Sequence, residues 1–91
     1  MTIRELVKEK GATVIDVRSS WEFADGHVND AINIPLEEIT TRIDEINELQ
    51  GPYLLYCRSG NRSGKSAVIL QQKGFDVYNV LGGYQQWRKE N

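Results

Sequence analysis

The chain has a single cysteine, a single histidine and two prolines among its 91 residues. One cysteine cannot form a disulfide within the chain, which favours a reducing compartment. No apolar run approaches the roughly 18 residues that a membrane-spanning helix needs, and the first ten residues lack the apolar core of a signal peptide. We therefore expect a cytoplasmic protein that does not associate with a membrane.

An excess of positive charge is also missing. The net charge is −2 and the pI is about 5.3, so no overall field would attract nucleic acid or an anionic membrane. The short chain, 40% of it hydrophobic, can build one small core but not two. We expect residues 1–91 to form a single domain that does not bind nucleic acid.

One stretch lacks acidic residues entirely. Between Leu49 and Phe75 there is no Asp or Glu, and the only cysteine, Cys57, lies within this stretch. The charged residues there are Arg58, Arg62, Lys65 and Lys73. Such a run also arises by chance on a solvated helix. Here it predicts a positively charged environment for the thiol.

The remaining pattern alternates between helices and strands. Apolar runs predict strands over residues 13–17, 31–34, 53–57 and 77–80. Helical spacing and capping residues predict helices over 3–10, 19–26, 35–49, 63–73 and 84–90. This order indicates an α/β fold with a mostly parallel sheet and helices on both of its faces.

The segment CRSGNRSGKS begins at Cys57, where the third predicted strand ends. In open α/β sheets, ligand sites lie beyond the carboxyl ends of the strands. The residues that follow lead into a helix N-terminus, whose free N–H groups attract negative charge, and Gly60 can turn successive amides inward. Such surroundings lower a thiol pKa from about 8.5, which predicts a nucleophilic thiolate. A lone cysteine is more commonly buried and inert, but Arg58 and Ser59 do not suit an apolar core.

Three blocks of the sequence resemble the rhodanese-like sulfurtransferases. They are IDVRSSWEFADGHVNDAINIP (Ile15 to Pro35), CRSGNRS (Cys57 to Ser63) and GFDVYNVLGGYQQW (Gly74 to Trp87). They occur in the order and at the spacing of that family, and together they span most of the chain. The resemblance implies a sheet of about five strands, a monomer or weak homodimer, and no metal or organic cofactor.

The resemblance also implies a reaction. Cys57 matches the residue that carries a sulfane sulfur as a persulfide, between an anionic donor such as thiosulfate and an acceptor such as cyanide, a thiol or a protein. The backbone of the loop would cradle the transferred sulfur. Its residues are Arg58, Ser59, Gly60, Asn61, Arg62 and Ser63.

Other conspicuous residues have supporting roles in this interpretation. Asp16 and Arg18 match the DVR of the family, and we expect them to support the site through hydrogen bonds and charge. Glu22 has the spacing of a helix cap. His27 matches a structural turn, and a thiolate that has already formed needs no general base.

The last block and its surroundings are predicted to serve packing and turns. Trp87 and the Gly82–Gly83 pair fit these roles, whereas Trp21 fits either the core or the rim of the site. Arg62 could bind substrate or hold the carbonyl groups of the loop. Asp30 stands where the family usually has glycine, which suggests an altered turn.

Three alternatives remain open from the sequence. Related phosphatases and arsenate reductases use a C-x5-R loop, whereas Arg62 here follows Cys57 at C-x4-R, and this shorter loop favours a single sulfur over a phosphoryl group. Many rhodanese-like domains are non-catalytic binding or regulatory modules, although these usually lack the cysteine. A sulfur carrier that serves one protein partner is the third alternative.

Overall fold

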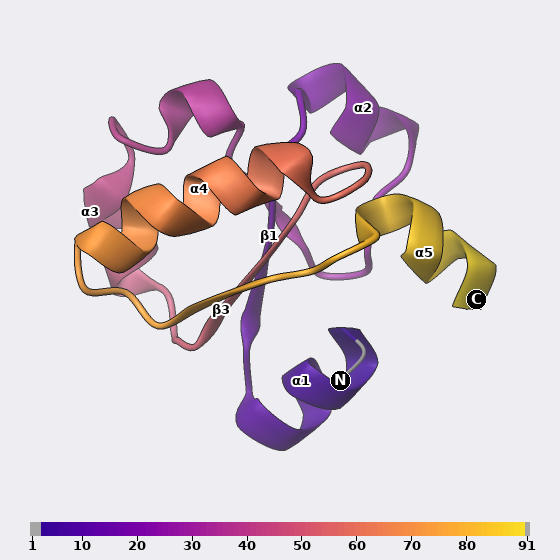
Figure 1. The fold of residues 1–91 in the computed structure, drawn as a ribbon, viewed down its shortest axis with the longest axis horizontal. Helices are drawn as coiled ribbons and strands as arrows, with labels where there is room; N and C mark the ends of the chain where they lie inside the picture. Colours follow the sequence, from indigo (N-terminus) through magenta and orange to yellow (C-terminus); the bar gives the residue numbers. More distant parts are fainter. Residues whose placement is uncertain (1–2, 91) are drawn as a thin grey trace.

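The computed structural model describes residues 3–90, and its centre is a four-stranded parallel sheet (Figure 1). The strands are β1 (Thr13–Asp16), β2 (Ile32–Asn33), β3 (Tyr53–Tyr56) and β4 (Val77–Asn79), in the spatial order β2-β1-β3-β4. All neighbouring pairs are parallel. Their carboxyl ends therefore meet at one edge of the sheet.

Helices cover both faces of this sheet (Figure 1). α1 (Ile3–Lys10) and α5 (Gly83–Glu90) lie on one face, and α3 (Ile43–Glu48) and α4 (Asn61–Gln72) lie on the other. α2 (Ser20–Asp25) sits beside the N-terminal end of α4. No helix among residues 3–90 has the length and apolar character needed to cross a membrane.

Two apolar clusters hold the layers together, one on each face of the sheet. Successive strand residues point to opposite faces, so Leu55 packs in the cluster under α4, whereas Leu54 packs in the cluster under α1. Ala67 and Leu70 supply the contribution of α4, and Ile3 and Leu6 supply that of α1. This arrangement confirms the fold class predicted from the alternating elements.

The expectation of about five strands is wrong for the described residues, because the sheet has four. The residues before β1 form α1, in which Ile3 and Leu6 lie one helical turn apart and are both buried. Each of the four strands also ends one residue earlier than predicted, so Cys57 follows β3 directly. α4 begins at Asn61, two residues before its predicted start.

The single helix predicted over residues 35–49 is also wrong. The chain forms a short 3₁₀ turn, η1 (Leu36–Glu38), and then the separate helix α3. The hydroxyl of Thr41 donates to the Glu38 carbonyl, which competes with a continuous helical ladder. Ile39 and Ile46 are nevertheless both fully buried, because the two short turns place the apolar stripe against the sheet.

Candidate active site

The loop that follows β3 lies between α2 and α5 at the carboxyl edge of the sheet (Figure 1). Gly60 precedes α4 and has a φ of 108°, which a side chain would disfavour. Its carbonyl accepts the N–H of Gly64 at 3.0 Å and so starts the helix. Of the predicted loop residues, Ser63 is buried, Gly60 and Arg62 are half-buried, and three are exposed: Arg58, Ser59 and Asn61.

Cys57 lies beneath this loop with its side chain only 1% exposed. The backbone N–H of Gly60 donates to its Sγ atom at 3.0 Å, and the Ser63 hydroxyl oxygen lies 3.4 Å from the same sulfur. Burial raises the pKa of Cys57, but hydrogen bonds from the Ser63 hydroxyl and from the amides of Ser63, Gly60 and Ser59 outweigh it. The net pKa lies below the ordinary value for a thiol, which favours the thiolate.

The N-terminus of α5 explains why the loop amides face the sulfur. The N–H of Tyr84 donates to the Cys57 carbonyl at 2.8 Å, and that of Gln85 donates to the Arg58 carbonyl at 3.3 Å. In a trans peptide the C=O and N–H point in opposite directions, so holding the Arg58 carbonyl outward aims the Ser59 N–H inward. Gly83 permits this approach, because a Cβ atom there would lie within hard contact of the Cys57 carbonyl oxygen.

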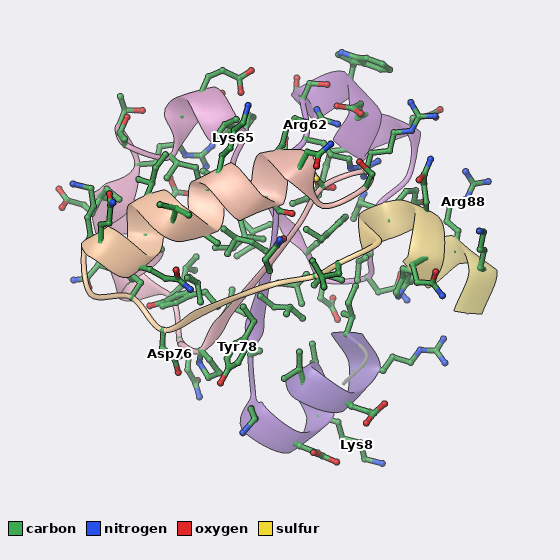
Figure 2. All side chains as sticks on the ribbon, viewed as in Figure 1. Lys8, Arg62, Lys65, Asp76, Tyr78 and Arg88 are labelled. Atoms are coloured by element: carbon green, nitrogen blue, oxygen red, sulfur yellow. The ribbon has the colours of Figure 1, made fainter. Side chains whose placement is uncertain are left out.

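Arg62 lies at the start of α4, beside α2 (Figure 2). It forms a bidentate ion pair with Glu22 of α2, at 2.6 and 3.0 Å. The carboxylate of Glu22 also accepts hydrogen bonds from the N–H and the hydroxyl of Ser19, so the predicted cap is present. The hydrogen bond from Arg62 lowers the pKa of Glu22 to about 2. Arg62 thus binds α2 rather than the loop carbonyls, and its charge is compensated on one side.

Asp16 and Arg18 form a second ion pair, which is buried. The guanidinium donates to both carboxylate oxygens, and Tyr56 donates its hydroxyl to Asp16 at 2.7 Å. The Arg18 guanidinium also donates to the Gly26 carbonyl and lies 4.4 Å from the centre of the Tyr84 ring. The pair thus connects β1, β3 and α5, the elements around the loop. It makes no hydrogen bond to Cys57.

A cleft of about 260 Å³ adjoins the loop. Trp21 is 73% exposed and lines this cleft together with Arg58, so it is a rim residue rather than a core residue. Other residues that line it are Arg18, Glu22, Asp25, Tyr84, Gln85 and Arg88. Trp87 instead packs against the apolar cluster under α1 and stacks on Tyr84, and Gly82 takes a positive φ in the turn before α5.

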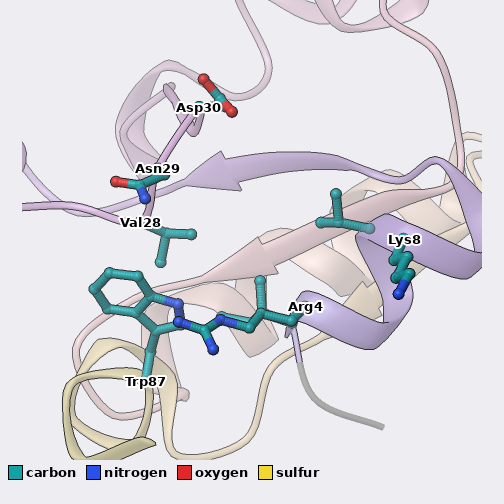
Figure 3. A pocket seen from close by; sticks show the side chains of 8 residues that line it. Arg4, Lys8, Val28, Asn29, Asp30 and Trp87 are labelled. Atoms are coloured by element: carbon teal, nitrogen blue, oxygen red, sulfur yellow. The ribbon is translucent and has the colours of Figure 1, made fainter. Parts of the chain in front are cut away.

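His27 and Asp30 belong to the turn that follows α2. His27 is exposed, its ring stacks on Phe23, and its Nδ1 atom lies 2.9 Å from the Phe23 carbonyl oxygen. Asp30 has a φ of 66°, so it takes the left-handed conformation that glycine favours, and the turn does not require a different backbone. Asp30 also lines a separate hollow of about 250 Å³ between α1 and Trp87 (Figure 3).

No group of three or more His, Cys, Asp or Glu side chains within residues 3–90 is arranged to hold a metal ion.

Sequence reasoning missed one residue at the sulfur site, Asn79. Its amide contacts the Ser63 hydroxyl, and its Nδ2 atom lies 3.4 Å from the Gly60 carbonyl oxygen. The signal was available in the strand VYNV. Alternation places Asn79 on the same face as the buried Val77, and a polar residue on an inward face needs a polar partner.

We compared the chain with known protein families, sequences and solved structures. Residues 2–90 match the family described as Rhodanese-like domain. YqhL of Bacillus subtilis is 42% identical over 77 residues, and thiosulfate sulfurtransferase GlpE of Pseudomonas putida is 40% identical over 85 residues. These matches cover 84% and 92% of this chain, which spans 60% of the length of YqhL and 76% of that of GlpE.

The solved structures show the same architecture. A rhodanese-related protein from Thermoplasma volcanium superimposes with a TM-score of 0.84 and is 35% identical. The superposition covers 97% of this chain and 88% of that protein. The similarity therefore includes the loop after β3 and the helices on both sides of it.

Proposed function

We propose, from the premise that this chain belongs to the rhodanese-like domain family, that Cys57 carries sulfur as a persulfide between a donor and an acceptor. The family and the similarity to GlpE support a sulfurtransferase in general. Thiosulfate is the donor that we propose, because GlpE is named a thiosulfate sulfurtransferase and because Arg58, the residue after Cys57, supplies an exposed cation.

The proposed reaction has two steps that balance without an oxidant or a reductant. The Cys57 thiolate attacks the outer sulfur of thiosulfate, the S–S bond of the donor breaks, and sulfite leaves with the bonding electron pair. An acceptor such as cyanide or a thiolate then attacks the outer sulfur of the persulfide. The S–S bond to Cys57 breaks, the product leaves with the sulfur, and the Cys57 thiolate is restored.

The observation that carries this proposal is the set of hydrogen-bond donors around the Cys57 sulfur. The Gly60 amide and the Ser63 hydroxyl lie within hydrogen-bond reach of Sγ, and the pKa of the thiol is lowered despite burial. Preorganised donors of this kind stabilise an anion on sulfur without reorganisation during the reaction. Because the Cys57 side chain is 1% exposed, we expect the exposed residues Arg58 and Ser59 to move when the donor approaches.

Intact-mass measurement tests the proposal. After incubation with thiosulfate, the protein should gain the mass of one sulfur atom, and cyanide should remove it as thiocyanate. Cys57→Ser should show neither change, because the hydroxyl cannot form the persulfide. A wild-type protein that stays at its original mass with thiosulfate and with an organic persulfide would contradict the proposal.

Two further outcomes separate the alternatives. Hydrolysis of phosphate esters without a sulfur adduct would favour the phosphatase. A stable adduct that small acceptors remove slowly, but that one protein removes quickly, would identify a sulfur carrier. Comparison of the rates with cyanide, small thiols and candidate proteins distinguishes the carrier from the enzyme.

A further inference from the structure

We infer that Asn79 is a positioning residue for the sulfur site, whose side-chain amide turns the Ser63 hydroxyl away from Cys57 until the sulfur becomes negatively charged. The inference rests on the proposed function, because it concerns the thiolate that would accept sulfur. The effect acts through the Ser63 hydroxyl on the readiness of Cys57 to ionise.

The register of the sheet brings Asn79 to the site. Leu55 of β3 pairs with Asn79 of β4, and Cys57 follows only two residues after Leu55. Val77 is buried against α4, and alternation directs Asn79 to that same face. The N-terminal turn of α4, which contains Ser63, lies directly above it.

The two contacts of the Asn79 side chain fix the direction of the Ser63 hydroxyl. The Gly60 carbonyl can only accept, so the atom facing it at 3.4 Å must be the amide nitrogen. The amide oxygen of Asn79 then faces Ser63 and can only accept as well. The Ser63 hydroxyl must therefore be the donor in the hydrogen bond with Asn79.

The single proton of this hydroxyl has three acceptors within reach. They are the Asn79 amide oxygen, the Gly60 carbonyl oxygen at 3.2 Å and the Cys57 sulfur at 3.4 Å. While Cys57 is a neutral thiol, the amide oxygen is a better acceptor than the sulfur. Once Cys57 ionises, the bond to the anion becomes the stronger one and the hydroxyl turns to it. The lost bond to Asn79 offsets part of the stabilisation that Ser63 gives the thiolate.

Charged groups near Cys57 do not take part in this competition. Arg62 of α4 attracts the thiolate but is held by Glu22 of α2, and Arg58 of the loop is exposed. The ion pair of Asp16, at the end of β1, with Arg18 is bound to Tyr56, on the opposite face of the sheet. The side chains of Ser63 and Asn79 carry no charge themselves, so the two should act as a neutral unit.

A double-mutant cycle with a direct readout of the thiol tests the inference. Because the chain has one cysteine, ¹³Cβ-labelled cysteine gives one resonance whose shift follows ionisation, with no need for a reagent to reach the buried sulfur. Asn79→Ala should lower the pKa of Cys57 by about half a unit to one unit, a three- to tenfold change in the ionisation constant. Ser63→Ala should raise it, because a donor to the thiolate is lost.

The coupling between Ser63 and Asn79 shows whether Asn79 acts through the Ser63 hydroxyl. In the Ser63→Ala background, Asn79→Ala should change the pKa of Cys57 no further, because its effect runs through the hydroxyl. The matched control Asn47→Ala, on the exposed side of α3, should leave the pKa unchanged. If Asn79→Ala does not fold, Asn79→Leu takes its place, since leucine has a similar volume and no acceptor.

Two results would overturn the inference: an Asn79→Ala pKa equal to or above that of the wild type, or the same shift with and without the Ser63 hydroxyl. The titration contains no sulfur donor. Its failure would therefore leave the proposed persulfide chemistry standing, and a failed persulfide assay would leave the titration result standing.

Discussion

Tyr56, the last residue of β3, and Cys57, the residue that follows it, have contrasting polar surroundings on opposite faces of the sheet. Tyr56 donates to Asp16, which is bound by Arg18, and both members of that ion pair are buried. Cys57 faces α4, where its sulfur meets the Gly60 amide and the Ser63 hydroxyl. One face thus holds two compensated charges, and the other holds a titratable group among neutral donors.

The two faces therefore have different roles. The face with Asp16, Arg18 and Tyr56 is a supporting face, and the face with Cys57 is the reacting face. The Asp16 centre is saturated, because its carboxylate binds Arg18 and Tyr56, and burial together with that hydrogen bond raises the pKa of Tyr56. A saturated network has no capacity to bind another group. The donors around Cys57 instead stabilise whatever negative charge the sulfur bears, in the thiolate and, as we propose, in the persulfide.

The largest effect on stability should follow from Asp16→Asn. This change leaves the Arg18 guanidinium buried without its counter-charge, so the free energy of unfolding should fall by about 3 kcal/mol or more. Denaturant titration measures this loss. Sulfur transfer by the folded fraction should change little, because Asp16 binds Tyr56 on the face of the sheet opposite Cys57.

The surface pair of Arg42 and Glu38 provides the control for that prediction. Glu38→Gln removes a partner that is 52% exposed, and the free energy of unfolding should change by only about 0.5 kcal/mol. If Asp16→Asn remained folded but lost sulfur transfer, the separation between a supporting face and a reacting face would be wrong.

The next effect concerns the reacting face and its dependence on α5. In Gly83→Ala, the new Cβ would collide with the Cys57 carbonyl oxygen and lie 2.9 Å from that of Arg58. Because these carbonyls could no longer be held by α5, the Ser59 amide would turn from the sulfur. We expect sulfur transfer to fall about a hundredfold, equivalent to about 2.7 kcal/mol in the barrier.

Gly74→Ala is the matched control for Gly83→Ala. Gly74 also has a positive φ, of 90°, but a Cβ there would meet no atom within 4 Å. This variant should lose about 1–2 kcal/mol of stability from backbone strain and keep its rate of sulfur transfer. Equal losses of activity in the two variants would show that strain, rather than contact with the loop, governs the site.

The sequence predicted the elements of the fold better than their contacts. Apolar runs identified all four strands of the sheet, and the position of Cys57 at the end of a predicted strand predicted its place at the carboxyl edge. The break between η1 and α3 escaped prediction, because 3₁₀ and α turns both place Ile39 and Ile46 against the sheet. Spacing alone cannot distinguish them without knowledge of the Thr41 hydrogen bond.

The sequence predicted which residues form the loop of the candidate site, but not which side chains pair with one another there. Glu22 and Arg62 are 40 positions apart, so only the packing of α2 beside α4 brings their charges together. Asn79 is separated from the loop in the same way and reaches it through the register of β3 and β4. A single sequence reveals which side chains are present. Only the long-range contacts show that the charge of Arg62 is already paired with that of Glu22.

The smallest expected effect distinguishes the two ion pairs by their exposure. The side chains of Arg62 and Glu22 are 36% and 15% exposed, against 6% and 0% for Arg18 and Asp16. Solvent screens the more exposed pair, so Glu22→Gln should lower the free energy of unfolding at neutral pH by only about 1 kcal/mol. Glu48→Gln, an exposed acid on α3, is the control and should have no measurable effect.

The pH dependence of that small effect gives the sharper test. The hydrogen bond from Arg62 lowers the pKa of Glu22 from 4.5 to about 2 in the folded state. A lowered carboxyl pKa contributes stability that is complete above the unfolded value and is lost as the pH falls toward the folded value. The difference between wild type and Glu22→Gln should therefore stay constant above about pH 5 and shrink between about pH 4.5 and pH 2. Denaturant titrations across this range measure it, and a difference that persisted at the acid end would mean that Glu22 acts through its packing and its hydrogen bonds with Ser19 rather than through the charge of Arg62.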